Sequence, residues 1–323
     1  MPRFTAILPL YNKASTINRA IASVLSQSVG DVEVIVVDDG STDGSVEAID
    51  KAHLAAIRLV RQDNAGPGRA RNAGAALATG ELLAFLDCDD EWKPGYLAAA
   101  GAALEEHGDC AAYVSGYAAG EGQAVQEDIL MRIIRQSGPH TIDGRDEPAA
   151  IKAYVDCFHS SATVVRRDVF ERYGGYYERD RCLYGEDSYF WLQVALGQGV
   201  YFDRAQHVVF HVEDSDLGVS QKGRHPRRPA LDFPEPLRAS CPPSRQEILA
   251  TLLAFYRLIE TEKLVAQGRT GEVAALRRSF PWPAGAARPH YLLREARVRV
   301  LDLLNRARSF ATQAGDSPKL RPR

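Results

Sequence analysis

The residues of this chain that could do chemistry are chiefly carboxylates, and the densest acidic cluster is Asp87-Cys88-Asp89-Asp90. It directly follows the apolar run Leu82 to Leu86. Carboxylates this close repel one another unless a cation neutralises them, and their hard oxygen atoms suit Mg²⁺ or Mn²⁺ bridging to phosphate oxygens. Such an ion stabilises the charge on a departing diphosphate. The alternative is a solvated acidic turn before the helix that we expect from about Pro94.

A second cluster, Asp38-Asp39-Gly40-Ser41, follows the β-branched run Val32 to Val37. A carboxylate at the end of a buried strand can accept hydrogen bonds from a nucleoside base or from ribose hydroxyls. Asp-Gly-Ser is also ordinary turn and cap chemistry, and for this cluster alone that structural alternative is favoured.

The third cluster is Gly185-Glu186-Asp187, at the start of a helix predicted over residues 187–196. Carboxylates are favoured at a helix N-terminus for purely structural reasons. The functional interpretation makes Asp187 a general base that takes the proton of an acceptor hydroxyl. His211 could complete a metal shell through a ring nitrogen, although a histidine in a predicted strand is more often structural.

Between the clusters lies a glycine-rich and arginine-rich turn, Asn64 to Asn72, that is suited to phosphate binding because backbone N–H groups and guanidinium groups both bind oxyanions. It is close to the dinucleotide-binding pattern GxGxxG, which raises a dehydrogenase as an alternative. Arg71 stands in place of the third glycine, however, and the turn follows the third predicted strand. Both features argue against that alternative.

The elements that must position these residues alternate between strand and helix in the first half of the chain. Apolar runs predict strands at 4–8, 32–37, 57–60 and 82–86, and helices are expected at 17–25, 45–55 and up to residue 78. Such alternation predicts an α/β fold with a mostly parallel sheet that binds ligands beyond the carboxyl ends of its strands. The Asp38 and Asp87 clusters both fall at that edge.

The pattern of the second half predicts how the chain is divided into domains. Residues 1–224 are expected to form the main domain, 225–243 a Pro-rich linker, and 244–323 a helical C-terminal extension. The segment from Arg288 to Arg323 holds nine Lys or Arg residues against three acids. Its apolar residues share one helical face, which predicts either contact with an anionic membrane surface or packing on its own domain or on a second subunit. That face is formed by Leu293, Ala296, Val300, Leu303 and Ala307.

The amino-acid composition excludes several classes of protein and of partner. The chain has 323 residues, a net charge of −3 and 45% apolar residues, so an ordinary globular protein is expected and a nucleic-acid partner is not. Five scattered cysteines without a CxxC pair predict a reducing, cytoplasmic location and no cysteine-built zinc site. No apolar run reaches the roughly 20 residues of a spanning helix, so membrane association is expected to be peripheral, at the inner face of the plasma membrane.

Taken in order, these pieces resemble the inverting glycosyltransferase family 2, which has the GT-A fold. The resemblance covers about residues 4 to 220 and is carried by five motifs. They are Ile7-Leu8-Pro9-Leu10-Tyr11-Asn12, Val36-Val37-Asp38-Asp39-Gly40-Ser41-Thr42-Asp43, Arg71-Asn72-Ala73-Gly74, Phe85-Leu86-Asp87-Cys88-Asp89-Asp90 and Gly185-Glu186-Asp187. His211 stands where members often carry a histidine, but the residues around it are unusual, and nothing after about Arg224 matches.

The resemblance implies a Rossmann-like mixed sheet flanked by helices, a nucleoside diphosphate sugar as donor, with uridine the commonest nucleoside, and Mn²⁺ or Mg²⁺ as cofactor. It implies a nucleotide-sugar site formed by Pro9, Tyr11, Asp39, Arg71, Asp87 and Asp89, a metal site at Asp89 and Asp90 with His211 as a further candidate, and Asp187 as the catalytic base.

We therefore expect sugar transfer, with inversion, to a glycan or lipid-linked acceptor in envelope polysaccharide synthesis. The rival hypothesis is a catalytically inactive sugar-nucleotide-binding module of a polysaccharide assembly complex, and a homo-oligomer is a further possibility. Nucleotidyltransferase chemistry is set aside because Tyr11-Asn12-Lys13 occupies the place of the Gly-rich loop that it requires.

Overall fold

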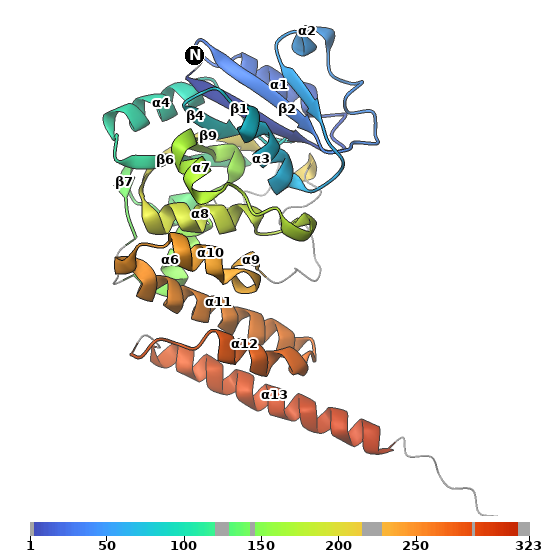
Figure 1. Ribbon diagram of the computed structural model, residues 1–323, viewed down its shortest axis with the longest axis vertical. Helices are drawn as coiled ribbons and strands as arrows, with labels where there is room; N and C mark the ends of the chain where they lie inside the picture. Colours follow the sequence, from blue (N-terminus) through green and yellow to red (C-terminus); the bar gives the residue numbers. More distant parts are fainter. Residues whose placement is uncertain (1–2, 120–128, 143–145, 215–227, 286–287, 316–323) are drawn as a thin grey trace, which may run out of the picture.

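A computed structural model describes residues 3–119, 129–142, 146–214, 228–285 and 288–315 (Figure 1). Its described strands form a nine-stranded mixed sheet in the order β3-β2-β1-β4-β8-β6-β9-β5, with β7 pairing to β9. In chain order the strands are β1 (Phe4–Leu10), β2 (Val32–Asp38), β3 (Arg58–Arg61), β4 (Leu82–Phe85), β5 (Glu91–Trp92), β6 (Cys110–Ala119), β7 (Gly138–His140), β8 (Thr163–Arg166) and β9 (Gly199–Phe210).

Strands β3, β2, β1 and β4 are parallel, and their carboxyl ends lie at one edge of the sheet. The register pairs Leu10 with Asp38 and Ile7 with Phe85. Because β1, β2 and β4 are covered on both faces, their continuous apolar runs are buried rather than alternating with polar residues. In the other half of the sheet β6 and β9 are parallel, while β8, β5 and β7 pair antiparallel to their neighbours.

Helices cover both faces of this sheet and continue beyond it (Figure 1). The helices are α1 (Ile17–Leu25), α2 (Lys51–Leu54), α3 (Pro67–Leu77), α4 (Tyr96–Glu106), α5 (Ile129–Ile133), α6 (Pro148–Val155), α7 (Arg167–Tyr173), α8 (Glu186–Gly197), α9 (Pro229–Asp232), α10 (Pro234–Ser240), α11 (Gln246–Ala266), α12 (Val273–Ser279) and α13 (Pro289–Gly315). The mixed α/β architecture with helices at its C-terminal end confirms the predicted fold class.

Two hydrophobic clusters lie on opposite faces of the sheet because successive strand residues point to opposite sides. Phe4, Ala6 and Leu8 pack with the buried faces of α1 and α4. Ile7 belongs to the other cluster, which includes residues of α3, α7 and α8 and extends through α9, α10 and α11 to α13. The second cluster therefore joins the sheet to the C-terminal helices.

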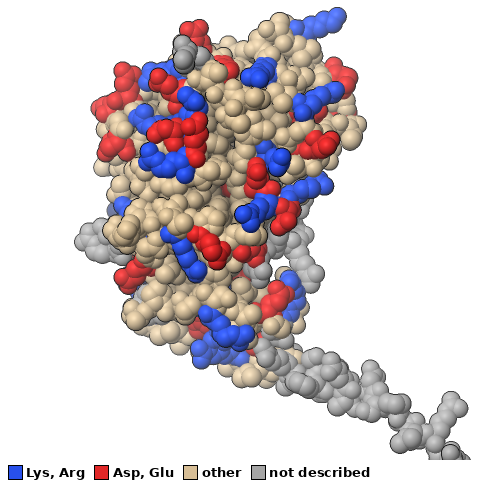
Figure 2. Space-filling model, in the orientation of Figure 1, with Lys and Arg blue, Asp and Glu red and all other residues tan. Residues whose placement is uncertain are grey.

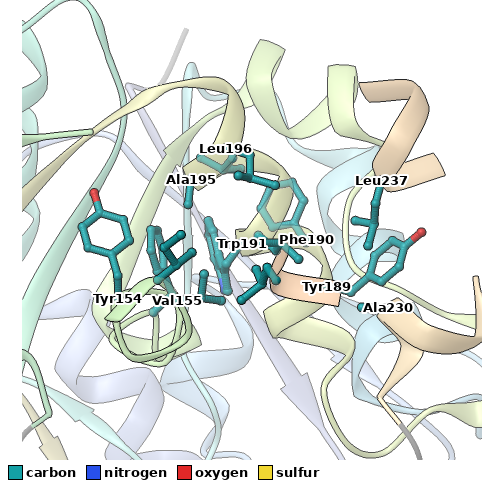
Figure 3. Close-up of a cluster of buried hydrophobic side chains, with 14 of the residues drawn as sticks. Tyr154, Val155, Tyr189, Phe190, Trp191, Ala195, Leu196, Ala230 and Leu237 are labelled. Carbon is teal, nitrogen blue, oxygen red and sulfur yellow. The ribbon is translucent and has the colours of Figure 1, made fainter. Parts of the chain in front are cut away.

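The Pro-rich segment differs from the linker predicted over 225–243. In its described part, from residue 228 onward, it forms helices α9 and α10, whose Ala230, Leu231 and Leu237 are buried. Figure 3 shows Ala230 and Leu237 beside Tyr189 of α8. The prolines permit these helices because Pro229 and Pro234 stand at the first turn, where proline costs no hydrogen bond.

The C-terminal extension is helical, as predicted. Helix α11 packs against α6 on one side and against α12 and α13 on the other. Within the described ranges no helix combines the length and the apolarity that crossing a bilayer requires.

Candidate active site

A pocket of about 930 Å³ opens at the carboxyl edge of the parallel strands. Segments that are far apart in sequence meet there, from the ends of β1, β2 and β4 to the start of α8. Of the predicted site residues, those that line the pocket are Pro9, Tyr11, Asp39, Arg71, Asp87, Asp89 and Asp187. Asp90 and His211 are not among the described residues that line it.

Asp39 follows β2 directly and is buried. Its carboxylate accepts hydrogen bonds from the side chain of Gln62 (2.7 Å) and from the backbone N–H groups of Ala65 (2.8 Å) and Gly66 (2.9 Å). Gly66, with φ of 95°, is the N-cap of α3. Asp39 thus fixes the turn that begins α3, in addition to forming part of the pocket wall.

Arg71 of α3 lies between two of the acidic clusters. Its buried guanidinium donates to Asp87 (2.5 Å) and to Glu186 (3.1 Å) and lies over the ring of Tyr176, 5.1 Å from the centroid. Burial alone would lower the pKa of Arg71, but the charges of Asp87 and Glu186 raise it, so the group is a permanent cation. The carboxyl end of β4 and the start of α8 are held together by this one side chain.

Asp87 and Asp89 have different electrostatic environments although they are two residues apart. Burial alone would raise the pKa of Asp87, but its contact with Arg71 lowers it. Burial and the charge of Asp87 raise the pKa of Asp89, whose carboxylate lies 3.0 Å from the ammonium of Lys13. The pocket therefore holds adjacent acidic oxygens that are only partly compensated by cations.

Asp90 and His211 lie together, just outside this pocket. Strands β5 and β9 pair antiparallel with Glu91 opposite Val209, so Asp90 and His211 leave the sheet at the same end. The Ser161 hydroxyl donates to Oδ2 of Asp90 (2.5 Å), whereas Oδ1 is buried and has no hydrogen-bond partner among the described residues. Nε2 of His211 is buried, has no hydrogen-bond partner within the described ranges, and lies 3.7 Å from a carboxylate oxygen of Glu91.

The two adjacent carboxylates at the start of α8 have different surroundings. Gly185 caps the helix with φ of 80°. Glu186 is buried against Arg71, and burial together with the charge of Asp187 raises its pKa to about 7. Asp187 lines the pocket, accepts a hydrogen bond from the N–H of Ser188 (2.6 Å), and has a pKa raised by burial.

Several residues that line the pocket were not predicted from the sequence. Lys13 contacts Asp89, and its only sequence signal is its position directly after the first-strand motif. His159 lines the wall, with its ring 5.1 Å from that of Phe210, and its Nδ1 is buried without a described hydrogen-bond partner. Arg228 lies in the segment predicted as a linker, where no local pattern marks it as part of a site.

Comparison with known proteins assigns this arrangement to a family. The family model described as glycosyl transferase family 2 matches residues 5–174. Over 95 residues the chain is 48% identical to an uncharacterized glycosyltransferase of Nostoc sp., a match that spans 28% of this chain and 30% of the relative. Over 237 residues it is 29% identical to the succinoglycan biosynthesis protein ExoW of Rhizobium meliloti, spanning 67% of this chain and 73% of that protein.

Solved structures share the fold. TarS of S. aureus (residues 1–349, in complex with UDP-GlcNAc) superposes with a TM-score of 0.69 at 19% identity, covering 99% of this chain and 94% of that one. The mannosyltransferase PcManGT of Pyrobaculum calidifontis, in complex with GDP-Man and Mn²⁺, gives a TM-score of 0.52 at 21% identity, covering 96% and 87%. The GT-A type of architecture expected from the sequence is thereby confirmed. Since the family model covers more than half of its length, the chain belongs to glycosyl transferase family 2.

Proposed function

We propose that the chain transfers a sugar from a nucleoside diphosphate sugar to an acceptor hydroxyl, with inversion at the anomeric carbon. The observation that carries this proposal is that one pocket is lined by all four of Asp39, Asp87, Asp89 and Asp187. A nucleotide-binding edge, an acidic diphosphate region and a separate carboxylate base are the groups that such a transfer requires.

The donor is proposed to be UDP-linked, with Pro9, Tyr11 and Asp39 on the nucleoside side of the pocket. The UDP-GlcNAc complex of TarS supports this choice of nucleoside. A glycan or lipid-linked acceptor in envelope polysaccharide synthesis is supported by the similarity to ExoW and to ExoO, a further relative from Rhizobium meliloti that is 44% identical over 98 residues, since both are succinoglycan biosynthesis proteins. A cytoplasmic location is supported by the five cysteines, which are free thiols in this structure.

Asp187 is the proposed general base. Its raised pKa makes it a stronger base than an exposed aspartate, which favours proton removal from a neutral hydroxyl. As the acceptor oxygen bonds to the anomeric carbon, the bond from that carbon to the phosphate oxygen breaks. The acceptor proton passes to Asp187, and the nucleoside diphosphate leaves with the bonding electrons. Glu186 is bound to Arg71 and so is not free to take this role.

The residues present fit a divalent cation. Asp90 Oδ1 and His211 Nε2 are buried polar atoms without hydrogen bonds among the described residues, and the pKa of Asp89 and that of Asp90 are raised by burial and by neighbouring negative charge. Asp89, Asp90 and His211 are therefore proposed to hold Mg²⁺ or Mn²⁺, which when bound stabilises negative charge on the leaving diphosphate. Lys13 and Arg71 supply positive charge at Asp89 and Asp87 from the chain itself.

Replacing Asp187 with Asn tests the base. We expect turnover to fall by roughly 10²- to 10⁴-fold while donor affinity, measured by calorimetry, stays within about 3-fold. Asp168→Asn is the matched control, because Asp168 also stands in the first turn of a helix but is exposed. Full activity of the Asp187→Asn variant would rule out the proposed role.

The inactive-module alternative predicts a different result. Such a protein would bind UDP-sugars through the same pocket but would neither transfer nor hydrolyse them, with or without Mn²⁺. Donor turnover by the unaltered chain therefore separates the two functions.

A further inference from the structure

The fold covers only one face of helix α13. Its buried residues Tyr291, Glu295, Val298 and Asp302 recur every three or four positions, which is the spacing of one helical face. This face packs towards α11, where Glu295 is ion-paired with Arg257. The sequence-based expectation that the helix packs on its own domain is therefore met for this face.

The other face is exposed and carries apolar side chains. Five large apolar side chains of α13 are between 50% and 72% exposed: Leu292, Leu293, Val300, Leu303 and Leu304. Single exposed leucines are ordinary on protein surfaces, but a contiguous row of this kind marks a surface that binds something. We call the row formed by Leu293, Val300 and Leu303 the outer face of α13.

The charges beside the outer face have one sign. The acidic residues of this part of the helix, Glu295 and Asp302, are buried on the opposite side. Arg297 and Arg299 are exposed and flank the row. A surface that offers leucines edged by arginines is complementary to an apolar layer edged by anions.

A second copy of this chain is a poor match for the same face. If two α13 helices paired through Leu293, Val300 and Leu303, Arg297 and Arg299 would occupy the positions that flank the seam. In helix pairs these positions normally hold opposite charges, and arginine facing arginine repels. An anionic bilayer surface presents no such conflict.

We propose that the outer face of α13 lies in the interfacial region of an anionic membrane, with Leu293, Val300 and Leu303 in the acyl boundary and Arg297 and Arg299 at lipid phosphates. Figure 1 shows α13 at the end of the molecule remote from β1 and β2, where it can lie flat on a surface. The proposal is independent of the proposed sugar transfer, because it invokes no residue of the pocket.

Co-sedimentation of the full chain with lipid vesicles tests this proposal. We expect binding to vesicles that contain phosphatidylglycerol, at least about 10-fold weaker binding to phosphatidylcholine alone, and a loss of binding as salt is raised. The pair Arg297→Gln and Arg299→Gln should weaken binding on the order of 20-fold, at about 5-fold for each arginine. The pair Leu293→Gln and Leu303→Gln should weaken it at least about 10-fold.

A matched control uses the opposite end of the molecule. Leu54→Gln with Arg58→Gln removes one exposed leucine and one exposed arginine from α2 and β3, and it should leave vesicle binding unchanged. Light scattering of each variant reports the oligomeric state in parallel. The proposal is overturned if the unaltered chain does not bind anionic vesicles, if the control loses as much binding as the α13 variants, or if Leu293→Gln with Leu303→Gln dissociates a dimer instead.

Discussion

Arg71 is a buried cation that holds two carboxylates from distant parts of the chain, Asp87 and Glu186. The charge of Arg71 lowers the pKa of both carboxylates against the effect of burial, because burying an uncompensated charge is costly. Both carboxylates of the third cluster line the pocket, but Glu186 is held by Arg71 whereas no hydrogen bond or ion pair of Asp187 with Arg71 is found among the described residues. One arginine therefore separates a structural acid from a proposed catalytic one.

Replacing Arg71 with Met should destabilise the protein by about 3 kcal/mol, because it leaves Asp87 and Glu186 buried without their cation. Arg69→Met is the control on the same helix. Its side chain is 57% exposed and lies 3.7 Å from Glu178, so we expect a loss of at most about 1 kcal/mol. Urea denaturation of both variants gives the comparison, and equal losses would contradict the assigned role of Arg71.

The pair Glu186 and Asp187 predicts how activity depends on pH. Burial and the charge of Asp187 raise the pKa of Glu186 to about 7, and burial raises the pKa of Asp187. A base with a raised pKa stays protonated to a higher pH, so activity should fall as the medium becomes more acidic. Because the charge of Asp187 raises the pKa of Glu186, Asp187 is still ionised when Glu186 takes up its proton, and Glu186 is already neutral where Asp187 titrates. Glu186→Gln should therefore leave the acidic limb of kcat/KM in place. A limb that moves to lower pH would contradict this order of titration, because Glu186 would then be charged while Asp187 titrates.

At the scale of elements, the packing of α3 on the sheet determines where Arg71 lies. Gly74 faces β1 and β2, and a Cβ atom at this position would lie 2.5 Å from Cγ2 of Ile7 and 3.3 Å from Cγ2 of Val37. Both neighbours are fully buried and have no room to move. The glycine of the Arg71-Asn72-Ala73-Gly74 motif is thus required by close helix–strand contact.

We expect Gly74→Ala to destabilise the protein by about 1 kcal/mol or more, because overpacking outweighs the gain in helix propensity. Turnover should also fall, since the shift of α3 carries Arg71 with it. Gly108→Ala is the control, as nothing lies within 4 Å of its Cβ position. Thermal denaturation and initial rates measure the two effects, and a stabilised Gly74→Ala variant would contradict the packing argument.

At the scale of the whole molecule, one hydrophobic cluster runs from the sheet to α13, so we expect the C-terminal helices and the sheet to fold as one unit. Figure 2 shows acidic and basic side chains interspersed over the face that it presents, in keeping with a net charge of only −3. Burial of apolar side chains, rather than a row of ion pairs, therefore joins the sheet to the C-terminal helices. Helices α9 and α10 occupy the junction.

Leu237→Ala in α10 tests this continuity. Leu237 is almost fully buried, and the cavity should cost about 2 to 5 kcal/mol. Hydrogen exchange should show the loss in β1 as well as in α11, because the two belong to one cooperative unit. A loss of protection confined to α11 would indicate that α9 and α10 are a true linker. As a control, Leu25→Ala, at an exposed site on α1, should change protection neither in β1 nor in α11.

The sequence by itself determined the alternation of strands and helices, and hence the edge at which its acidic motifs end. The physical reason is local: a buried parallel strand must be a continuous apolar run, and polar residues can follow only where it ends. A local pattern also led to one wrong prediction of a helix. The helix expected over 45–55 is reduced to α2 (Lys51–Leu54), since Ser45 instead hydrogen-bonds with Lys13 and Asp43.

Only the tertiary structure decided what surrounds each of the neighbouring carboxylates. Glu186 and Asp187 are adjacent in sequence, and their different surroundings depend on how α8 packs against α3 and the pocket. Asp90 likewise lies against Ser161, which is far away in the chain, whereas Asp89 lies at the pocket beside Lys13. The burial of the Pro-rich helices and the exposure of the outer face of α13 were decided in the same way. Each depends on contacts with residues distant in the sequence, or on their absence within the described ranges, and a local sequence pattern does not reveal these.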